Sequence, residues 1–288
     1  MSFRLAGITD EFSPDIEVAA RAMREAGLQG AELRMIFGKN VVDLADGELG
    51  RAIATVRAQG LEIVSIASPV LKCVLPGGPA VEERWQKDMF AAAYGFDDQP
   101  RVAGRAFDIA ERAGAGIVRV FSYWRTIRPR ETFERTVEAL LDLAERAGRR
   151  GLVIGLENEH ACNIATGEEA ARALRAARHP SLKIVWDPAN ALVAGERPFP
   201  DGYRKIPQDL IAHVHAKDCR MANSAPEWLR LGEGSVDWKG QMAALAHDGY
   251  RGWISLETHW PGPDGDKLQG SILCARSLKR LADGASPD

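Results

Sequence analysis

Four short apolar runs decide the fold of this chain, and each leads to an acidic residue or a histidine: LVIGLE (152–157), LKIVWD (182–187), IAHVHAKD (211–218) and WISLE (253–257). Asp187 follows Glu157 by 30 residues, and His215 follows Asp187 by 28. Glu257 comes 42 residues after His215, because a polar loop (CRMANSAPEWLRLGEG) intervenes. A strand–helix–strand crossover takes roughly 30 residues. The spacing therefore predicts that these residues lie at the C-terminal ends of successive parallel strands.

Strand-like and helix-like segments alternate along the whole chain. Eight runs have the character of strands: Leu5–Asp10, Gly30–Arg34, Glu62–Ser68, Gly116–Ser122, Leu152–Glu157, Leu182–Asp187, Ile211–Lys217 and Gly252–Glu257. Six segments between them have helical periodicity: Asp15–Ala26, Asp46–Gln59, Arg101–Ala113, 131–149, Glu168–Ala177 and Val236–His247. This alternation, without a break in composition, predicts a closed (β/α)8 TIM barrel of the α/β class, with residues 1–288 as a single domain.

The strand ends of such a barrel form its active-site mouth. Three carboxylates and an imidazole that converge there repel one another unless a divalent cation neutralises the carboxylates. The residues predicted to bind a metal ion are therefore Glu157, Asp187, His215 and Glu257. His213 shares the inward face of its strand with His215, two residues deeper. It is either a buried histidine behind the ligands or the rival for the imidazole position.

Composition narrows the class of protein. Lysine and arginine number 37 against 40 acidic residues, a net charge of −3, which gives no indication of the basic face typical of nucleic-acid-binding proteins. The four cysteines are far apart and form no CxxC pair, as in cytosolic proteins with reduced thiols. Residues 1–30 contain no signal-peptide core, and no charge-free apolar run is long enough to span a membrane. The sequence thus predicts a cytoplasmic protein without a membrane span.

Seven motifs, in this order, resemble one known family: ITDEFSPD (8–15), GAELR (30–34), GLENEH (155–160), WDPANA (186–191), HVHAKD (213–218), LGEGSVDW (231–238) and GYRGWISLE (249–257). They are similar to the sugar phosphate isomerase/epimerase family of xylose isomerase-like TIM barrels, in the AP endonuclease family 2 superfamily. The resemblance covers nearly the whole chain and implies metal ligands at Glu157, Asp187, His215 and Glu257. It implies a divalent ion, first manganese, with magnesium, cobalt or zinc as alternatives, which agrees with a donor set of carboxylates and one imidazole.

The epimerases of this family move a proton beside a ketose carbonyl, and the metal stabilises the enediolate. Two glutamates act as acid and base on opposite faces of the substrate, and the resemblance places them at Glu157 and Glu257. Two positions depart from the ketose 3-epimerases. Asn190 stands where those enzymes have a histidine, and Met221 stands where they have an arginine. The stretch His215–Asp218 is instead typical of the broader family.

The function predicted from these features is a metal-dependent isomerase or epimerase that acts on a small sugar or related polyhydroxy carbonyl compound. A dehydratase (lyase) acting on a keto-sugar, inosose or related substrate is the alternative, because the same enediolate can expel a β-hydroxyl. An abasic-site endonuclease of this fold holds three metals with many more histidines than the six present here. A non-catalytic sugar-binding barrel would normally have lost a ligand. The expected partner is a small carbohydrate, not nucleic acid or a membrane, and the family implies a homodimer or homotetramer.

Further polar residues near strand ends are expected to contact the substrate: Glu32, Lys72, Glu159 and Lys217. Three tryptophans near the same rim either stack on a sugar ring or pack helices onto the barrel: Trp124, Trp186 and Trp260. The long connection 69–100 is either an active-site lid or, in its second half, a surface helix. The stretch LGEGSVDW is predicted to be a tight turn, in which Asp237 or Ser235 caps the next helix.

Overall fold

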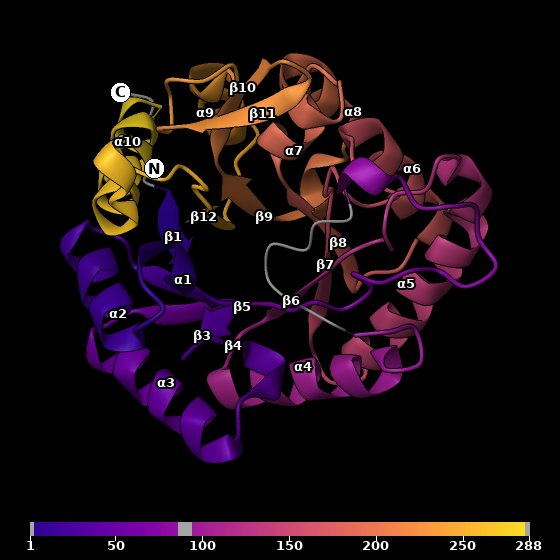
Figure 1. The fold of residues 1–288 in the computed structure, drawn as a ribbon, viewed down its shortest axis with the longest axis horizontal. Helices are drawn as coiled ribbons and strands as arrows, with labels where there is room; N and C mark the ends of the chain where they lie inside the picture. The colour runs from indigo at the N-terminus through magenta and orange to yellow at the C-terminus, as the bar shows by residue number, and fades with distance from the viewer. Residues whose placement is uncertain (1–2, 86–93, 286–288) are drawn as a thin grey trace.

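The computed structural model describes residues 3–85 and 94–285, and in them eight parallel strands close into a barrel (Figure 1). The strands are β1 Arg4–Ile8, β2 Gly30–Leu33, β5 Glu62–Ala67, β6 Ile117–Val120, β7 Val153–Glu157, β8 Leu182–Trp186, β9 Ile211–Ala216 and β12 Trp253–Leu256. Their order around the barrel is β1-β12-β9-β8-β7-β6-β5-β2, and β1 also pairs with β2, which closes the ring. The predicted (β/α)8 barrel is confirmed.

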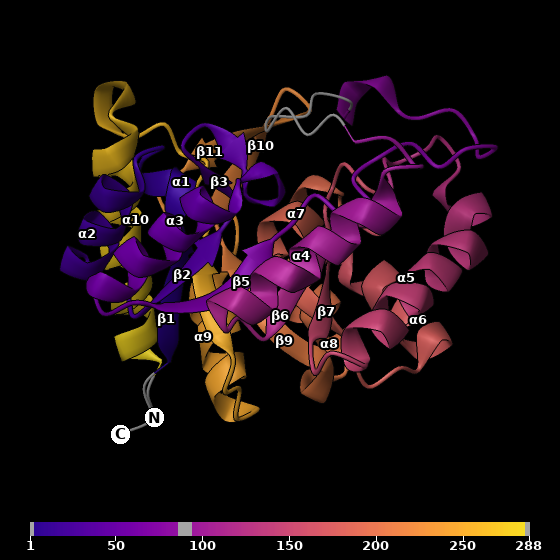
Figure 2. The same cartoon turned by 90° about the horizontal axis from the view of Figure 1, so that it is seen from below.

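Helices surround the barrel on its outside (Figures 1 and 2). The long ones are α2 Ile16–Glu25, α3 Asp46–Ala58, α4 Gln99–Ala113, α5 Phe133–Gly148, α6 Gly167–Ala177, α9 Trp238–His247 and α10 Lys267–Gly284, and the short ones are α1 Thr9–Phe12, α7 Pro188–Val193 and α8 Tyr203–Lys205. All six predicted helices are present. The sequence did not reveal α10, whose buried face consists largely of small or polar residues such as Gly270, Ser271 and Cys274.

Two connections differ from the prediction. The polar stretch after β9, expected to be a loop, forms a hairpin of β10 Asp218–Ala222 and β11 Ala225–Leu229. Its turn residues, Asn223 and Ser224, both have positive φ, which matches the right-handed twist of a two-residue hairpin. The first strand was expected to reach Asp10 but ends at Ile8, because the next four residues form α1. A second small hairpin, β3 Met35–Ile36 with β4 Lys39–Asn40, follows β2.

The loop after the β10–β11 hairpin is organised around one buried carboxylate. Asp218 accepts hydrogen bonds from the backbone N–H groups of Cys219, Gly232, Gly234 and Val236, at 2.9 to 3.2 Å. These amides are therefore occupied by a side chain of the protein, in agreement with the expectation that LGEGSVDW is a turn. The predicted cap is also confirmed, since the Asp237 carboxylate accepts a hydrogen bond from the backbone of the first turn of α9.

The connection 69–100 is described only in part, because residues 86–93 lie outside the described residues. Its described part includes a 3-10 turn, Glu83–Trp85, and a β-bridge between Val81 and Thr126. Residues from Gln99 onward belong to α4. The choice between a lid and a surface helix thus stays open. Within the described ranges, no helix is both long and apolar enough to cross a membrane.

The floor of the barrel is packed so closely that one position admits only glycine. A Cβ atom on Gly30, at the start of β2, would lie 2.7 Å from Val64 Cγ1, 2.9 Å from Trp253 Cζ3 and 3.0 Å from Ala6 Cβ. These neighbours come from three different strands, and together they form a small apolar cluster inside the barrel. One small shift therefore cannot relieve all three contacts.

We expect Gly30→Ala to lower the free energy of unfolding by about 1–3 kcal/mol, the usual cost of overpacking a core. Chemical denaturation of the two proteins measures this. The matched control is Gly104→Ala in α4, where nothing lies within 4 Å of the added Cβ. That change should raise stability by about 0.5–1 kcal/mol, because alanine is the better helix former. Equal stability of Gly30→Ala and the unchanged protein would contradict the packing argument.

Candidate metal centre

The four residues predicted as metal ligands lie together at the mouth of the barrel. Glu157 ends β7, Asp187 follows β8, His215 lies near the end of β9 and Glu257 follows β12. Each offers one ligand atom, and these four atoms lie within 4.8 Å of one another. The His215 Nδ1 atom is 3.4 Å from Glu157 Oε1 and 3.2 Å from Glu257 Oε2. All four side chains are buried.

One oxygen of each carboxylate is held by the protein on the outer side of the group. Arg119 Nη1 donates to Glu157 Oε2 at 2.6 Å, and Arg34 Nη1 donates to Glu257 Oε1 at 2.7 Å. Asp187 caps α7, and its Oδ1 accepts from a backbone N–H at 2.8 Å. The remaining oxygen of each carboxylate faces the other ligand residues. We call four atoms the inner atoms: Glu157 Oε1, Asp187 Oδ2, Glu257 Oε2 and His215 Nδ1.

Lys217 brings a positive charge to the inner atoms. Its Nζ lies 2.9 Å from Asp187 Oδ2 and 2.9 Å from Glu257 Oε2, and the side chain is buried. Burial lowers the pKa of Lys217, but the carboxylates around it outweigh this and raise the pKa well above the ordinary value. Lys217, predicted as a substrate contact, is therefore an ammonium group within the cluster, and a metal ion would share two carboxylates with it.

The inner atoms fit a divalent cation. Asp187 Oδ2 is buried and has no hydrogen-bond donor, since the approach of Lys217 is an ion pair without hydrogen-bond geometry. Burial raises the pKa of Asp187 to about 6, and the neighbouring Glu157 and Glu257 add to the rise against the effect of Lys217. Three carboxylates and one imidazole nitrogen form a donor set typical of borderline-hard divalent metals, and the positive charge of Lys217 alone does not balance the three negative charges.

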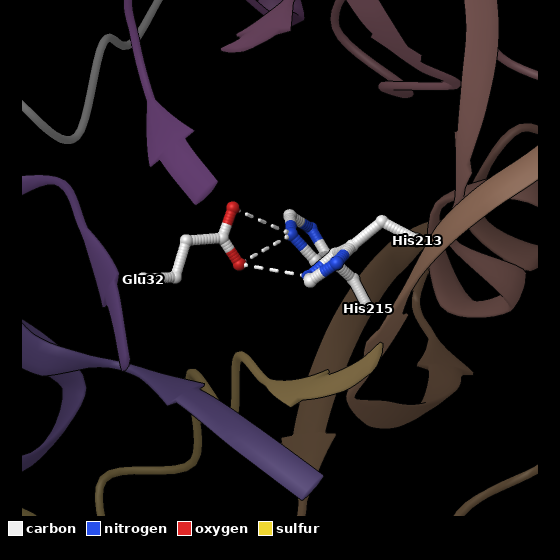
Figure 3. A group of neighbouring side chains, drawn as sticks. All are labelled: Glu32, His213 and His215. Carbon is white, nitrogen blue, oxygen red and sulfur yellow. Dashed lines mark hydrogen bonds and ion pairs between the residues drawn. The ribbon is translucent and has the colours of Figure 1, made fainter. Parts of the chain in front are cut away.

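Glu32 faces the rings of both His213 and His215 (Figure 3), and His213 lies two residues before His215 on β9, farther from the strand end. Glu32 Oε2 is 3.1 Å from His213 Nε2 and 3.2 Å from His215 Nε2. His213 Nε2 is also 2.9 Å from Ser255 Oγ. His215 is thus bound on both ring nitrogens by acidic groups, whereas His213 lies away from the inner atoms. Glu32, predicted as a substrate contact, has the two imidazoles as its partners.

Glu159 and Lys72 lie at the rim on the β5–β7 side. Asn190 Nδ2 donates to Glu159 Oε2 and to Glu157 Oε1, both at 3.1 Å, and so links the rim to the cluster. Asn190 Oδ1 in turn is 2.7 Å from His160 Nδ1. Burial raises the pKa of Glu159, but His160 and Lys72 outweigh it and lower the pKa. Lys72 Nζ lies 4.6 Å from the centre of the Phe121 ring.

Trp228, on β11, is a rim residue that the sequence did not reveal. Its ring centroid is 4.9 Å from that of His259, 6.4 Å from that of His160 and 5.7 Å from Lys217 Nζ. The side chain is half-buried and comes from the hairpin that follows β9. The sequence feature that could have indicated a role for Trp228 is its position as a large aromatic residue in an otherwise polar stretch.

The three tryptophans considered from the sequence have different surroundings. Trp186 is fully buried and donates from Nε1 to Gln241 Oε1 at 2.9 Å, so it packs α9 against the barrel. Trp124 lies at the rim, with its ring 5.4 Å from Lys72 Nζ. Trp260 is half-buried and packs against the apolar core.

Arg34 and Arg119 were also missed as parts of the site. Arg119 is a charged residue inside the apolar strand β6, and it is 4% exposed. A cation in such a position needs a buried anion as its partner. The sequence could therefore have indicated that Arg119 binds a buried carboxylate, but not which one. Arg34 was noted only as a strand-end residue, yet it binds Asp10, Glu11 and Glu257 together.

A family model described as xylose isomerase-like TIM barrel matches residues 20–278. The chain belongs to this family. The expected family resemblance is thereby confirmed.

Two known proteins match part of the sequence. The 3-dehydroshikimate dehydratase of Pseudomonas putida is 32% identical over 163 residues, which cover 54% of this chain and 25% of that protein. The inosose dehydratase of Bacillus licheniformis is 28% identical over 170 residues, which cover 52% of this chain and 54% of that protein. The matches span about half or less of the length of these relatives.

Solved structures match over nearly the whole length. The IOLI protein with a bound zinc atom has a TM-score of 0.73 at 14% identity, covering 99% of this chain and 98% of the other. The D-allulose 3-epimerase of a Methylomonas species has a TM-score of 0.70 at 17% identity, covering 98% of this chain and 98% of the other. At these identities the likeness shows the fold alone.

We expect Asp187→Ala to abolish binding of a divalent ion, because the change removes one of four ligand atoms. Elemental analysis should find about one ion per chain in the unchanged protein and almost none in the variant. An ion present at 100 times its dissociation constant stabilises the folded state by about 2.7 kcal/mol, so a chelator should lower the Tm of the unchanged protein only. Asp209→Ala, at an exposed position, is the control. Full occupancy in Asp187→Ala would refute the assignment.

Proposed function

We propose that this chain is a divalent-metal-dependent enzyme that removes a proton from the carbon beside the carbonyl group of a small polyhydroxylated compound. The observation that supports the proposal is the convergence of three carboxylates and His215 Nδ1 at the strand ends, where barrel enzymes have their active sites. A divalent ion, first manganese and otherwise magnesium, cobalt or zinc, would polarise the carbonyl oxygen as a Lewis acid.

The side chains supply both a base and an acid. Burial raises the pKa of Glu257, but Lys217 and His215 outweigh it and hold the pKa well below the ordinary value. Burial likewise raises the pKa of Glu157, and His215 and Arg119 lower it further than burial raises it. Both groups are therefore carboxylates at neutral pH and are able to accept a proton, and the lowered pKa makes each of them a weaker base than an ordinary glutamate. Lys217 is the buried ammonium beside them and is the nearest group that carries a proton to donate.

Loss of water is the outcome that we favour. The two sequence relatives described above are dehydratases, and Asn190 and Met221 replace the residues expected of a ketose 3-epimerase. In this reaction a glutamate takes the proton from carbon, and the Lys217 ammonium gives a proton to the departing β-hydroxyl. The substrate therefore loses one proton and one hydroxide, which together make one molecule of water. The proton on the glutamate then passes to Lys217, so that both side chains return to their starting states.

Isomerisation or epimerisation, the function predicted from the sequence, is the second candidate. It is favoured by the presence of two glutamates, since epimerisation needs a base on one face of the substrate and an acid on the other. Glu157 and Glu257 extend from β7 and β12, which are separated by β8 and β9 around the barrel. A small carbohydrate as partner, the absence of nucleic acid and membrane partners, and a homodimer or homotetramer stay predictions.

Incubation with a panel of ketoses, ketose phosphates, inososes and related keto compounds in D2O tests the proposal. We expect deuterium to enter one substrate at the carbon beside its carbonyl, with a product lighter by one water. Mass spectrometry separates the two outcomes, because an isomerase gives an isobaric product. A metal-loaded protein that exchanges no proton with any compound of these classes would contradict the proposal.

If the reaction is loss of water, we expect one of the two variants Glu157→Gln and Glu257→Gln to reduce turnover by about 10²–10⁴-fold, the usual contribution of a general base, whereas epimerisation would require both glutamates. Turnover is measured with metal occupancy verified for each protein, so that loss of the ion is not mistaken for loss of the base. Glu168→Gln, at an exposed position on α6, is the control and should leave turnover unchanged. Near-normal turnover in both metal-bound variants would show that neither glutamate is the base.

Trp228 should contact the apolar C–H face of the substrate from above the cluster. We expect Trp228→Leu to raise KM by about 2- to 10-fold, corresponding to the 0.5–1.5 kcal/mol typical of aromatic contacts beyond buried area. The affinity for the metal ion should not change, because the ring contacts no ligand atom of the carboxylates. An unchanged KM would place the substrate elsewhere.

A further inference from the structure

Glu32 is a carboxylate in the barrel interior whose partners are two histidines (Figure 3). It lies on β2, and its exposed fraction is 0%. Its Oε2 atom is 3.1 Å from His213 Nε2 and 3.2 Å from His215 Nε2, and its Oε1 atom is 3.4 Å from His215 Nε2. Among the described residues, the structure shows no other hydrogen-bond partner of this carboxylate. An ionised carboxylate accepts hydrogen bonds only, so both imidazoles present an N–H to it.

This arrangement decides which nitrogen of His215 keeps its proton when a metal ion is bound. A neutral imidazole carries one proton, on either Nδ1 or Nε2. With that proton on Nε2 and directed to Glu32, the lone pair of Nδ1 points toward Glu157 Oε1 and Glu257 Oε2, 3.4 and 3.2 Å away. A lone pair among carboxylate oxygens is unfavourable unless a cation lies between them. Glu32 therefore prepares His215 Nδ1 to bind a positive ion.

We propose that Glu32 is a positioning residue that holds His215 in the Nε2–H tautomer and so sets the affinity of the site for its metal ion. This inference rests on the proposed metal-dependent function. It replaces the expected role of Glu32 as a substrate contact, because the carboxylate lies behind the imidazoles and both of its oxygens are engaged by them. A carboxylate that orients a ligating histidine also raises the basicity of the ring.

His213 completes the support of Glu32. Its Nε2 lies near both Glu32 and Ser255 Oγ, the latter on the neighbouring strand β12 at 2.9 Å. Its Nδ1 atom is buried without a hydrogen-bond partner, which is tolerable for a lone pair and unfavourable for an N–H donor. The same tautomer thus fits both histidines. The opposing possibility is a second ion bound by Glu32, His213 and His215, whose ligand atoms also lie within 4.8 Å.

The test is titration of the metal-free full chain with Mn²⁺ or Zn²⁺, measuring affinity and stoichiometry. We expect one ion per chain, and a Kd about 10- to 100-fold higher in Glu32→Gln, the usual effect of removing an outer carboxylate. Glutamine keeps the volume but turns an N–H group toward one imidazole. Glu32→Asp keeps the charge but withdraws it by one methylene, and its Kd should lie in between. Glu62→Gln, at an exposed position on β5, is the matched control and should bind as tightly as the unchanged protein.

The outcomes are separable. If the unchanged protein binds no divalent ion, the proposed function itself fails. If it binds one ion and Glu32→Gln binds with the same Kd, or shows only a higher KM for substrate, the positioning role is overturned. Two ions per chain, reduced to one by Glu32→Gln, would also overturn it in favour of a second metal site.

A measurement on the unchanged protein covers the case in which the variants do not fold. Long-range ¹H–¹⁵N correlation spectra of the Zn²⁺-loaded protein report which nitrogen of each histidine carries a proton. We expect His215 to be protonated on Nε2 and to bind zinc through Nδ1. The reverse arrangement would overturn the inference.

Discussion

Negative charge buried at the mouth of the barrel is the constraint on which the rest of the site depends. Placing an ionised group in the interior costs several kcal/mol unless a partner compensates it. Glu157 and Glu257 each have a guanidinium on the outer oxygen, from Arg119 on β6 and from Arg34 just after β2. The site therefore involves strands that contribute no proposed metal ligand. Arg119 reaches Glu157 from the neighbouring strand β6, whereas the pair of Arg34 and Glu257 depends on closure of the barrel, because β2 and β12 lie on the two sides of β1.

Strand β9 and the residue after it place three side chains of the site at successive depths in the barrel. Along β9 and the residue that follows its end, side chains alternate between the interior and the surrounding helices. The interior positions are His213 at the bottom, His215 among the carboxylates and Lys217 above. Asp218 then binds four backbone amides of the next loop and fixes the place where the chain leaves the barrel. One stretch of six residues thus holds the deep hydrogen-bond network, the proposed ligand and the proposed acid in a fixed order.

Local patterns were sufficient to predict the barrel, its eight strands and six of its long helices, because periodicity and strand-end residues are visible in the sequence. The same patterns also predicted that the four proposed ligands lie at one end of the barrel. What they could not give is the identity of partners across the barrel. Arg34 and Glu257 are 223 residues apart, and nothing local connects them. The β10–β11 hairpin was hidden for another reason, since its strands are short, polar and contain a proline, Pro226.

The charge that remains after these pairings supports a cation of more than one unit. Histidines apart, the buried charged side chains in the described parts of the chain comprise seven carboxylates and three basic groups: Glu11, Glu32, Glu157, Glu159, Asp187, Asp218 and Glu257 against Arg34, Arg119 and Lys217. Asp218 is compensated by backbone amides, and Glu11 has His259 and Lys267 nearby in addition to Arg34. Lys217 is shared by Asp187 and Glu257, so negative charge remains at the inner atoms and at Glu159 and Glu32 beside them. A proton on His215 would supply one positive charge there, whereas a divalent ion at Nδ1 would supply two and leave Nε2–H for Glu32. Burial lowers the pKa of His215, but the carboxylates on both sides of the ring outweigh it and raise the pKa well above the ordinary value. A divalent ion at Nδ1 would take the place of that second proton and add one more positive charge where three carboxylates meet.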